Sequence, residues 1–346
     1  MLPARYVDRL PLEEVTIAEI LKAKGYSTGF FGKWHLGGDA AHWPEHQGFD
    51  VNVGGWSRGS PMGGYFSPWE NPRLESTHDD EYLTERLASE CASFIERQDG
   101  PYFAMLSFYA VHTPLQGRPD LVERYREKKA TRPETVWGVE GERKVRQSQD
   151  HAVYAAMVHA MDEAVGVVLD AIEARGEADE TLVVFFSDNG GLSTSEGHPT
   201  SNLPLRAGKG WVYEGGIREP CVIRWPGVTT AGTTIDTPIS SIDFLPTIAS
   251  ACGSSWPEVD GIDLRPVIEG DVPDRALFWH YPHYGNQGGS PAGAMREGRY
   301  KLIEWYEPGR EVELFDLEAD PGETTNLASE LPERVESMLQ RLQAWR

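Results

Sequence analysis

The sequence predicts an α/β fold, with a mostly parallel sheet sandwiched by helices and a small antiparallel sheet plus helix after it. Up to about residue 265, apolar strand-like segments alternate with amphipathic helical segments, an order that is typical of parallel sheets. Beyond that point, short alternating segments are separated by turn residues, which is typical of antiparallel sheets. We therefore expect an α/β domain over residues 1–265 and a small C-terminal α+β subdomain over residues 266–346.

Three apolar segments have the character of strands in the main sheet. They are residues 25–32, 101–111 and 181–187. The last of them, Thr-Leu-Val-Val-Phe-Phe-Ser, is apolar on both faces, as a central parallel strand requires.

Helices are expected between these strands, over residues 16–24, 83–95 and 150–175. Thr16 and Glu19 have the spacing of a capping box, and Gly25 is the expected stop of the first helix. Thr77 is the expected cap ahead of the second helix, whose apolar residues recur at helical spacing. The third helix is long and amphipathic throughout.

The remaining segments are expected to be less regular or to form the second sheet. Residues 37–78 are rich in Gly, Pro, Trp and His and predict a long irregular excursion, and residues 117–149 are polar and predict an exposed segment. The expected antiparallel strands lie within residues 277–281, 294–305 and 312–317. Pro332 opens a closing helix whose apolar residues face inward: Val335, Met338, Leu339 and Leu342.

The charge balance excludes some classes of function. The chain of 346 residues has 32 Lys and Arg against 54 Asp and Glu, a formal net charge of −22. This argues against a protein whose main activity is to bind nucleic acid or an anionic membrane, but not against a small anionic substrate. No apolar run approaches the roughly 18 residues of a membrane span. The amino terminus lacks the apolar core of a signal peptide, and the three cysteines form neither a disulfide framework nor a metal-binding pattern.

Polar residues of unusual type follow each of the three apolar strands. They are Gly-Lys-Trp-His-Leu-Gly at residues 32–37, Val-His-Thr-Pro at residues 111–114 and Ser-Asp-Asn-Gly-Gly at residues 187–191. Ligands of open α/β sheets bind outside the carboxyl ends of the strands, so we expect these groups to converge on one rim. A glycine-rich segment at residues 208–218 adds a second lysine, Lys209.

The residue types at this rim fit the chemistry of a tetrahedral oxyanion. Asp188 and Asn189 offer hard oxygen ligands for Ca²⁺ or Mg²⁺. Lys33 and Lys209 offer positive charge, and His35 and His112 can move protons near neutral pH. Together they suit displacement at sulfate or phosphate. Plainer interpretations stay open for each motif alone, because Asp, Asn and Gly also favour turns and a basic loop can balance an acidic surface.

In their order along the chain, these motifs resemble those of the type I sulfatases, the formylglycine-dependent branch of the alkaline phosphatase superfamily. The segment Gly-Lys-Gly…Glu-Gly-Gly-Ile-Arg-Glu-Pro at residues 208–220 completes the set. Weaker segments also resemble the family, at residues 46–50, 242–246, 260–264 and 314–321. The resemblance covers essentially the whole chain and implies an alkaline phosphatase-like fold and sulfuric ester hydrolysis.

The resemblance also implies roles for individual residues. Asp188 and Asn189 would bind a metal, usually Ca²⁺ in this family, with Mg²⁺ as the alternative. Lys33 and Lys209 would contact the sulfate oxygens. His35 would assist the nucleophile and its regeneration, and His112 would contact the substrate and help to protonate the leaving alcohol.

One part of the family pattern is absent from this sequence. The family's nucleophile is a cysteine in Cys-x-Pro/Ala-Ser-Arg that is oxidised to formylglycine, and no such motif occurs here. Cys91 and Cys221 are expected to be small buried hydrophobes, and Asp79-Asp80 is expected to cap a helix rather than to bind metal. We expect that the chain begins downstream of the nucleophile and of two further metal ligands. The alternative is a catalytically inactive homologue.

The expected function is sulfuric ester hydrolysis on a sulfated carbohydrate or an aryl sulfate, with little turnover by this chain. The alternatives are a phosphate or phosphonate ester hydrolase of the same superfamily and a non-catalytic module that binds anions or glycans. The expected partner is the sulfated molecule, with no nucleic acid and no membrane. The sequence itself assigns no compartment, although members of the family are often periplasmic or secreted.

Overall fold

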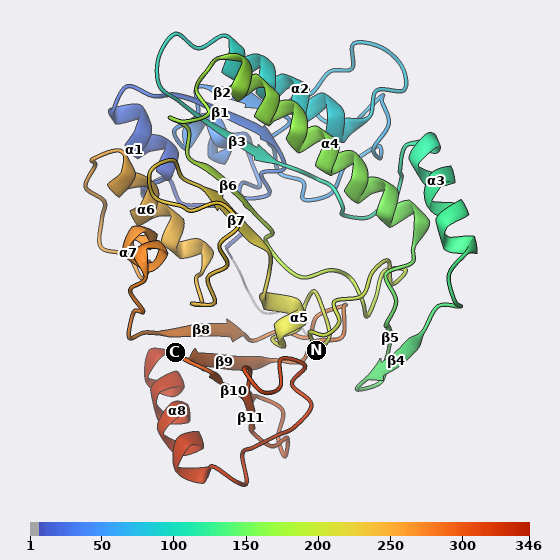
Figure 1. The fold of residues 1–346 in the computed structure, drawn as a ribbon, viewed down its shortest axis with the longest axis vertical. Coiled ribbons are helices and arrows are strands. Elements are labelled where there is room, and N and C mark those ends of the chain that lie inside the picture. The colour runs from blue at the N-terminus through green and yellow to red at the C-terminus, as the bar shows by residue number, and fades with distance from the viewer. Residues whose placement is uncertain (1–6) are drawn as a thin grey trace.

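The computed structural model describes residues 7–346 and has the α/β architecture that the sequence predicts. Three parallel strands form the first sheet in the order β2-β1-β3 (Figure 1). These strands are β1 (Ser27–Gly32), β2 (Val51–Val53) and β3 (Tyr102–Ser107). The helices α2 (Leu83–Glu96) and α4 (Ala152–Ala174) run side by side over one face, and α1 (Ile17–Ala23) contacts β1 and α6 (Phe244–Ala251).

The core of this part lies between the sheet and the helices α2 and α4. Phe31 of β1, Cys91 and Phe94 of α2, and Ala171 and Ile172 of α4 form one buried cluster. Cys91 is buried as expected, and burial raises the pKa of its thiol to about 12. By length and composition α4 also passes as a membrane-crossing helix, but here it packs against α2 and α3 (Pro119–Ala130).

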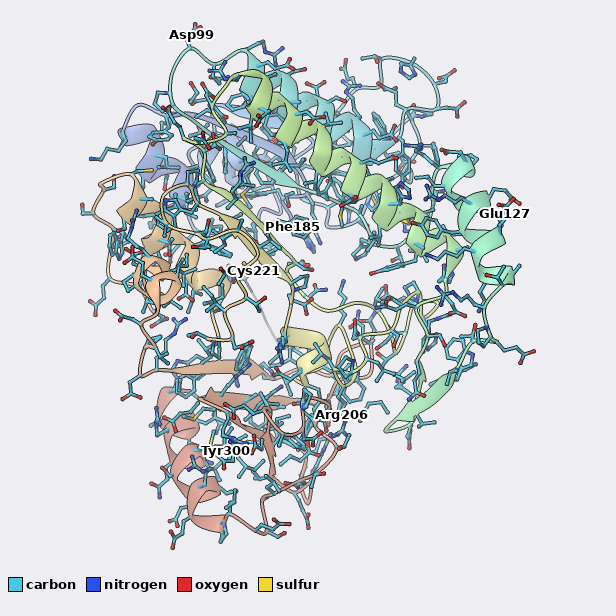
Figure 2. The ribbon with its side chains drawn as sticks, in the orientation of Figure 1. Asp99, Glu127, Phe185, Arg206, Cys221 and Tyr300 are labelled. Atoms are coloured by element: carbon cyan, nitrogen blue, oxygen red, sulfur yellow. The ribbon has the colours of Figure 1, made fainter. Side chains whose placement is uncertain are left out.

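The third apolar segment differs from the expected central parallel strand. It forms β6 (Val183–Phe186), which pairs antiparallel with β7 (Cys221–Arg224). Within residues 7–346 no ladder joins β6 to β3, so the two pairings form separate sheets. Phe186 and Val222 are therefore 41% and 62% exposed. Cys221, labelled in Figure 2, is exposed too, which corrects the expectation that it is buried.

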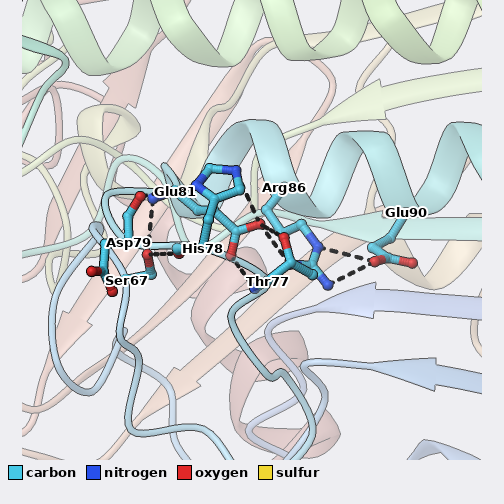
Figure 3. A network of polar contacts seen from close by, with 7 residues as sticks. All are labelled: Ser67, Thr77, His78, Asp79, Glu81, Arg86 and Glu90. Carbon is cyan, nitrogen blue, oxygen red and sulfur yellow. Dashed lines mark hydrogen bonds and ion pairs between the residues drawn. The ribbon is translucent and has the colours of Figure 1, made fainter.

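The two expected helix starts have different outcomes. The capping box of α1 is confirmed, because the Glu19 backbone N–H donates to the Thr16 hydroxyl at 3.1 Å and the Glu19 carboxylate accepts from the Thr16 N–H at 2.9 Å. The expected caps of α2 are wrong, since Tyr82 precedes its first residue and no side chain caps it. Thr77 instead donates to Glu81 from its N–H and its hydroxyl, both at 2.8 Å, as Figure 3 shows.

The network in Figure 3 explains why acidic residues lie ahead of α2. The Glu81 side chain is buried and pairs with Arg86 at 2.8 Å, and Arg86 also pairs with Glu90 one turn further along the helix. The same segment is tied to an earlier loop by the Ser67 hydroxyl, which accepts from the Glu81 N–H at 2.8 Å. These contacts fix the entry to α2 without a cap, and Asp79 and Asp80 play no capping role in it.

Both segments expected to be irregular contain regular elements. Residues 37–78 include β2 and two 3₁₀ turns, Ala40–His42 and Pro44–His46. Residues 117–149 include α3 and a hairpin made of β4 (Trp137–Glu140) and β5 (Arg143–Arg146). The sequence signal is weak here because α3 buries only Leu121 and Val122 and each hairpin strand is only four residues long.

The second sheet is antiparallel, as expected, in the order β11-β10-β9-β8. Its strands are β8 (Ala276–Tyr281), β9 (Ala292–Glu297), β10 (Tyr300–Trp305) and β11 (Glu313–Asp316). The closing helix α8 (Pro332–Trp345) packs on this sheet and buries Met338 and Leu342. The short helix α7 (Leu264–Glu269) precedes the sheet in the chain, and a boundary between domains at residue 265 stays a prediction.

Candidate active site

The first motif leaves β1 with its side chains placed by a buried tryptophan. The Lys33 backbone N–H donates to the Ser107 carbonyl of β3 at 2.8 Å, which continues the strand pairing. The Trp34 ring is buried and packs edge-on against Phe30, with the ring centroids 5.2 Å apart. Trp34 thereby anchors the motif between Lys33, which is half-buried, and His35, which is exposed.

The conformation of His35 depends on a glycine in a distant loop. His35 has a φ of 60°, a left-handed conformation that is uncommon outside glycine. A Cβ added at Gly59 would lie 2.2 Å from Nδ1 of the His35 ring, so only glycine allows this approach. The His35 N–H also donates to the Trp56 carbonyl at 3.1 Å. The excursion over residues 37–78 thus positions His35.

The second motif follows β3, and its histidine is held at two points. The buried Tyr65 hydroxyl donates to the His112 carbonyl at 2.9 Å. Nδ1 of the His112 ring lies 2.8 Å from the Thr113 carbonyl, which can only accept a hydrogen bond. Nδ1 therefore carries the proton in the neutral ring, and Nε2 is the nitrogen that can exchange a proton with a ligand.

The third motif, the turn at residues 188–191, touches the lysine loop at residues 206–217 backbone to backbone. A Cβ at Gly190 would lie 1.9 Å from the Gly215 carbonyl oxygen, and one at Gly208 would lie 2.3 Å from the Gly191 carbonyl oxygen. The Lys209 N–H donates to the Gly191 carbonyl at 3.2 Å. The glycines of the two motifs are thus a steric requirement of their close approach, which sets Lys209 beside the Asp188-Asn189 turn.

One side chain that the sequence did not single out joins the same two segments. The Asn202 amide donates to the Gly191 carbonyl at 2.9 Å and to the Ala207 carbonyl at 2.8 Å, and its oxygen accepts from the Gly191 N–H at 3.2 Å. Ala207 has a left-handed φ of 59°, and its carbonyl accepts a second hydrogen bond from the Ser193 hydroxyl at 2.8 Å. These bonds hold a strained residue two positions ahead of Lys209.

The lysine loop is held from its other side by the C-terminal sheet. Lys301 of β10 is fully buried, with Nζ 3.0 Å from Glu214 at the start of α5 (Glu214–Ile217) and 2.9 Å from Glu323. The Glu214 N–H donates to Glu323 at 2.6 Å. Arg206, which lies next to α5 in Figure 2, forms a two-pronged pair with Glu140, both contacts at 2.8 Å.

The charged side chains of the predicted site lie close enough to influence the pKa values of Lys33 and His35. Burial lowers the pKa of Lys33, and the nearby charges of Asp188 and Lys209 act on it in opposite directions. Although His35 as a whole is exposed, partial shielding of its ring from water lowers its pKa, assisted by the charges of Lys33, His112 and Lys209. Within residues 7–346, neither Lys33 nor Lys209 forms an ion pair. The rim therefore presents two unneutralised ammonium groups beside two histidines.

The pKa of His112 is lowered as well, chiefly by burial. The bond to the Thr113 carbonyl opposes this shift, and the charges of Lys209 and Lys33 lower the pKa further. The nearby carboxylate of Glu196 acts in the opposite direction. Glu196 also accepts from Thr113 at 3.3 Å and from Gln287 at 2.9 Å. No local pattern marks Glu196 in the sequence, because its contacts depend on distant loops that meet only in the folded chain.

A cavity of about 380 Å³ opens beside Asp188 and Asn189 and extends to Trp279, His280 and Tyr281 of β8. Glu219 also lines it, and one of its carboxylate oxygens is buried without a partner within the described residues. Burial and the charge of Asp188 raise the pKa of Glu219 to about 8. Glu219 lies in the quoted Arg-Glu-Pro segment, but nothing in the pattern marked it as a shifted acid.

The donors for a metal are of the right type but few. The Asn189 amide nitrogen donates to the Gly190 carbonyl at 3.0 Å, so its oxygen is free to bind a cation beside Asp188. Ca²⁺ takes roughly six to eight oxygen ligands. Across residues 7–346, no group of three or more His, Cys, Asp and Glu side chains is arranged to hold a metal ion. Asp188 and Asn189 thus fit part of a Ca²⁺ site.

The cysteines do not fit the formylglycine of the resembled family. Cys91 is buried inside α2, and Cys221 is the first residue of β7 and stands outside any Cys-x-Pro/Ala-Ser-Arg segment. Cys252 follows α6, and its Gly-Ser-Ser context lacks the arginine of the modification motif. No chemical step in this chain is therefore assigned to a formylglycine.

Comparison with known proteins places this chain in a family. Residues 2–254 match the family model described as Sulfatase, and residues 207–345 match the model described as N-sulphoglucosamine sulphohydrolase, C-terminal. The chain belongs to the sulfatase family. A sulfatase of Formosa agariphila is 33% identical over 96% of this chain and 69% of its own length. Human arylsulfatase A is 31% identical over 96% of this chain and 70% of its own length.

Solved structures agree with this assignment. The crystal structure of Ps i-CgsB in complex with k-i-k-neocarrahexaose is similar with a TM-score of 0.82 and 26% identity, over 99% of this chain and 76% of that one. A structure in complex with its substrate D-Glucosamine-2-N, 6-O-disulfate has a TM-score of 0.75 and 21% identity, over 97% of this chain and 82% of that one, and shows the shared fold. The sulfatase resemblance and the alkaline phosphatase-like fold are confirmed, and sulfatase family members are sulfuric ester hydrolases.

Proposed function

We propose that the rim formed by the motifs at Lys33, His112, Asp188 and Lys209 binds the sulfate group of a sulfated carbohydrate or an aryl sulfate for ester hydrolysis. The observation that carries the proposal is the pair of lysines without ion pairs beside the two histidines. An ammonium group that loses water on folding and gains no carboxylate is poised for an external anion. A sulfate ester supplies that anion together with an apolar or sugar leaving group.

Each residue of the rim has a distinct proposed role. Lys33 and Lys209 hold the sulfate oxygens, and the charge that develops on those oxygens strengthens the contact. His112 presents Nε2 toward the leaving oxygen, because Nδ1 is engaged by the Thr113 carbonyl. His35 exchanges a proton on the side of the attacking group. The lowered pKa values of both histidines make their neutral forms dominant at pH 7.

Asp188 and Asn189 are the proposed metal ligands of this chain. A bound divalent cation would supply positive charge to the sulfate oxygens and orient them. The two side chains cover only part of the coordination that Ca²⁺ requires. We therefore expect weak Ca²⁺ binding by this chain, which calorimetry can measure. Tight one-to-one binding would show that the ligand set is larger than these two residues.

The proposal is tested by titrating 4-nitrophenyl sulfate into the 346-residue chain by isothermal calorimetry. We expect saturable binding that Lys33→Met and Lys209→Met each weaken about tenfold or more, the size of one charge-assisted contact. We expect no release of 4-nitrophenol, since the chain has no formylglycine motif. Unchanged affinity in both lysine variants would contradict the proposed site, and rapid hydrolysis abolished by His112→Ala would contradict the expected inactivity.

A further inference from the structure

The hairpin β4–β5 concentrates positive charge in an acidic protein. Arg143, Lys144 and Arg146 lie within four residues of a chain whose net charge is −22. The three side chains differ in their exposure and in their partners. Arg146 is buried, pairs with Asp150, and donates from Nε to the His198 carbonyl. It anchors the hairpin and leaves the other two basic residues as the exposed ones.

Arg143 and Lys144 are cations without partners. Within residues 7–346, neither forms an ion pair or donates a side-chain hydrogen bond, although acidic residues outnumber basic ones in the chain. Lys144 is nevertheless placed, because its Nζ lies 3.8 Å from the centre of the Trp137 ring. Trp137 in turn packs edge-on against His198, 5.6 Å between ring centroids. Because the Trp137 ring already restricts the Lys144 side chain, binding of an anion to Lys144 costs less side-chain entropy than it would at a mobile lysine.

The hairpin lies against the loops that surround the proposed sulfate site. A Cβ at Gly288 would lie 2.7 Å from Cγ of Arg143 and 3.0 Å from the Trp211 ring, so Gly288 packs closely against both side chains. One at Gly210 would lie 2.9 Å from Gln287. Arg143 thus packs on Gly288, and the neighbouring Gln287 packs on Gly210, which precedes Trp211 and follows Lys209 in the chain. The pair between Glu140 and Arg206 fastens the hairpin to the same loop.

We propose that Arg143 and Lys144 form a second anion subsite, which binds another sulfate group on the same carbohydrate chain. The inference rests on the proposed function, since it requires one sulfate at Lys33 and Lys209. It selects a carbohydrate with at least two sulfate groups over a singly sulfated aryl ester. A guanidinium matches two sulfate oxygens with two parallel N–H donors, and the lysine adds a point charge.

A plainer interpretation assigns these residues to the solubility of an exposed hairpin, since lysine at strand edges discourages aggregation. The two interpretations differ in what they predict for binding. A subsite adds affinity only for a ligand that reaches both places at once, because the second contact is then intramolecular. Basic residues that serve solubility add the same weak attraction for every anion, and salt screens that attraction.

The test compares two oligosaccharides of identical sugars, one with a single terminal sulfate and one with a sulfate on each residue, by calorimetry at fixed ionic strength. We expect the multiply sulfated chain to bind the native protein about tenfold more tightly. The double variant Arg143→Gln/Lys144→Gln should lose that preference and still bind 4-nitrophenyl sulfate as the native protein does. The matched control is Arg97→Gln/Arg124→Gln, which removes the same charge from exposed residues of α3 and the end of α2.

Any of four results would overturn the subsite. The native protein could bind both oligosaccharides equally, the hairpin variant could keep the preference, or the charge-matched control could lose it to the same extent. Equal tightening by a DNA oligonucleotide of the same charge would also overturn it, by showing attraction for any polyanion. Failure of the proposed function is recognised separately, because it appears as 4-nitrophenyl sulfate binding that Lys33→Met and Lys209→Met leave unchanged.

Discussion

Two lysines that lose contact with water in the fold differ in whether carboxylates pair with them. Lys301 of the C-terminal sheet is fully buried and lies within 3.0 Å of two carboxylates, Glu214 and Glu323. Lys33 at the rim of the first sheet is half-buried and has no ion pair within residues 7–346. The pKa of Lys33 is lowered, chiefly by burial.

The difference separates a structural charge from a charge kept for a ligand. A buried charge whose partners are built into the fold contributes to stability when it is compared with the same site missing one partner. A desolvated charge without a partner weakens the fold slightly and gains when an anion arrives. We therefore expect Lys301 to matter for unfolding and Lys33 to matter for binding.

The largest expected effect follows from removing the paired lysine. Lys301→Met leaves Glu214 and Glu323 buried against each other, and we expect it to lower the free energy of unfolding by about 3–5 kcal/mol. Urea denaturation followed by circular dichroism measures this. Lys33→Met should change the same quantity by less than about 0.5 kcal/mol or raise it. A Lys33→Met loss as large as that of Lys301→Met would remove the distinction between the two lysines.

An exposed ion pair provides the control for the first experiment. Lys22 pairs with Asp50 at 2.6 Å, and both side chains are more than 40% exposed. Lys22→Met should therefore cost less than about 1 kcal/mol, as exposed pairs usually do. A loss comparable to that of Lys301→Met would show that burial is not what makes the Lys301 pairs important.

A smaller effect is expected at Asn202, which does not contact the ligand in our proposal but helps to position Lys209. Asn202→Ala removes the hydrogen bonds to Gly191 and Ala207, and we expect 4-nitrophenyl sulfate to bind about fivefold more weakly, roughly 1 kcal/mol. Asn202→Asp keeps the shape and loses the donors, so it should weaken binding at least as much. Binding at native strength in both variants would show that Lys209 is held by its glycine contacts alone.

The smallest effect tests an unpaired acid at the same rim. Glu219 has a pKa raised to about 8 by burial and by Asp188. The folded state therefore holds a proton on Glu219 that the unfolded state releases above its ordinary pKa, and this contribution to stability falls as pH rises from about 4.5 to about 8. In metal-free buffer, Glu219→Gln should be about 1 kcal/mol more stable than the native chain at pH 8 and equal to it at pH 4.

Thermal unfolding at several pH values measures the Glu219 effect. Glu81 offers the matched control, because Thr77 and Arg86 hold its carboxylate in hydrogen bonds and its pKa is lowered, even though burial acts in the opposite direction. Glu81→Gln should destabilise the protein at pH 8. A stabilising Glu81→Gln, or a Glu219→Gln difference that does not change with pH, would contradict this account of the two acids.

Most of the fold could be predicted from patterns among residues that are close together in the sequence. The capping box of Thr16 and the apolar periodicity of α2 and α4 depend on residues close in the chain, and these elements were predictable. The pairing of β6 was not, because a strand that is apolar on both faces does not specify its neighbours. The hairpin β4–β5 was also missed, since strands of only four residues within a charged segment give too weak a pattern.

The candidate site was predictable in its motifs and not in its supports. Lys33, His112, Asp188 and Lys209 follow apolar strands or lie between glycines, which marks them locally. Asn202 forms its hydrogen bonds to Gly191 only once the turn at residues 188–191 is folded. In the sequence it is an isolated asparagine between serine and leucine, with no pattern that indicates this role. Side chains that position others are recognised only once the backbone that they join is in place.

Lys33 and Lys209 leave their charges free for a tetrahedral oxyanion, either a sulfate ester or free sulfate, and this is what most needs testing. Selenate has the charge and shape of sulfate and scatters X-rays anomalously, so a crystal of this chain grown with selenate tests the claim directly. We predict one strong anomalous peak within hydrogen-bonding distance of Nζ of both lysines, and its loss in crystals of Lys33→Met/Lys209→Met. A saturated crystal with selenate bound elsewhere, and none at the two lysines, would contradict the account.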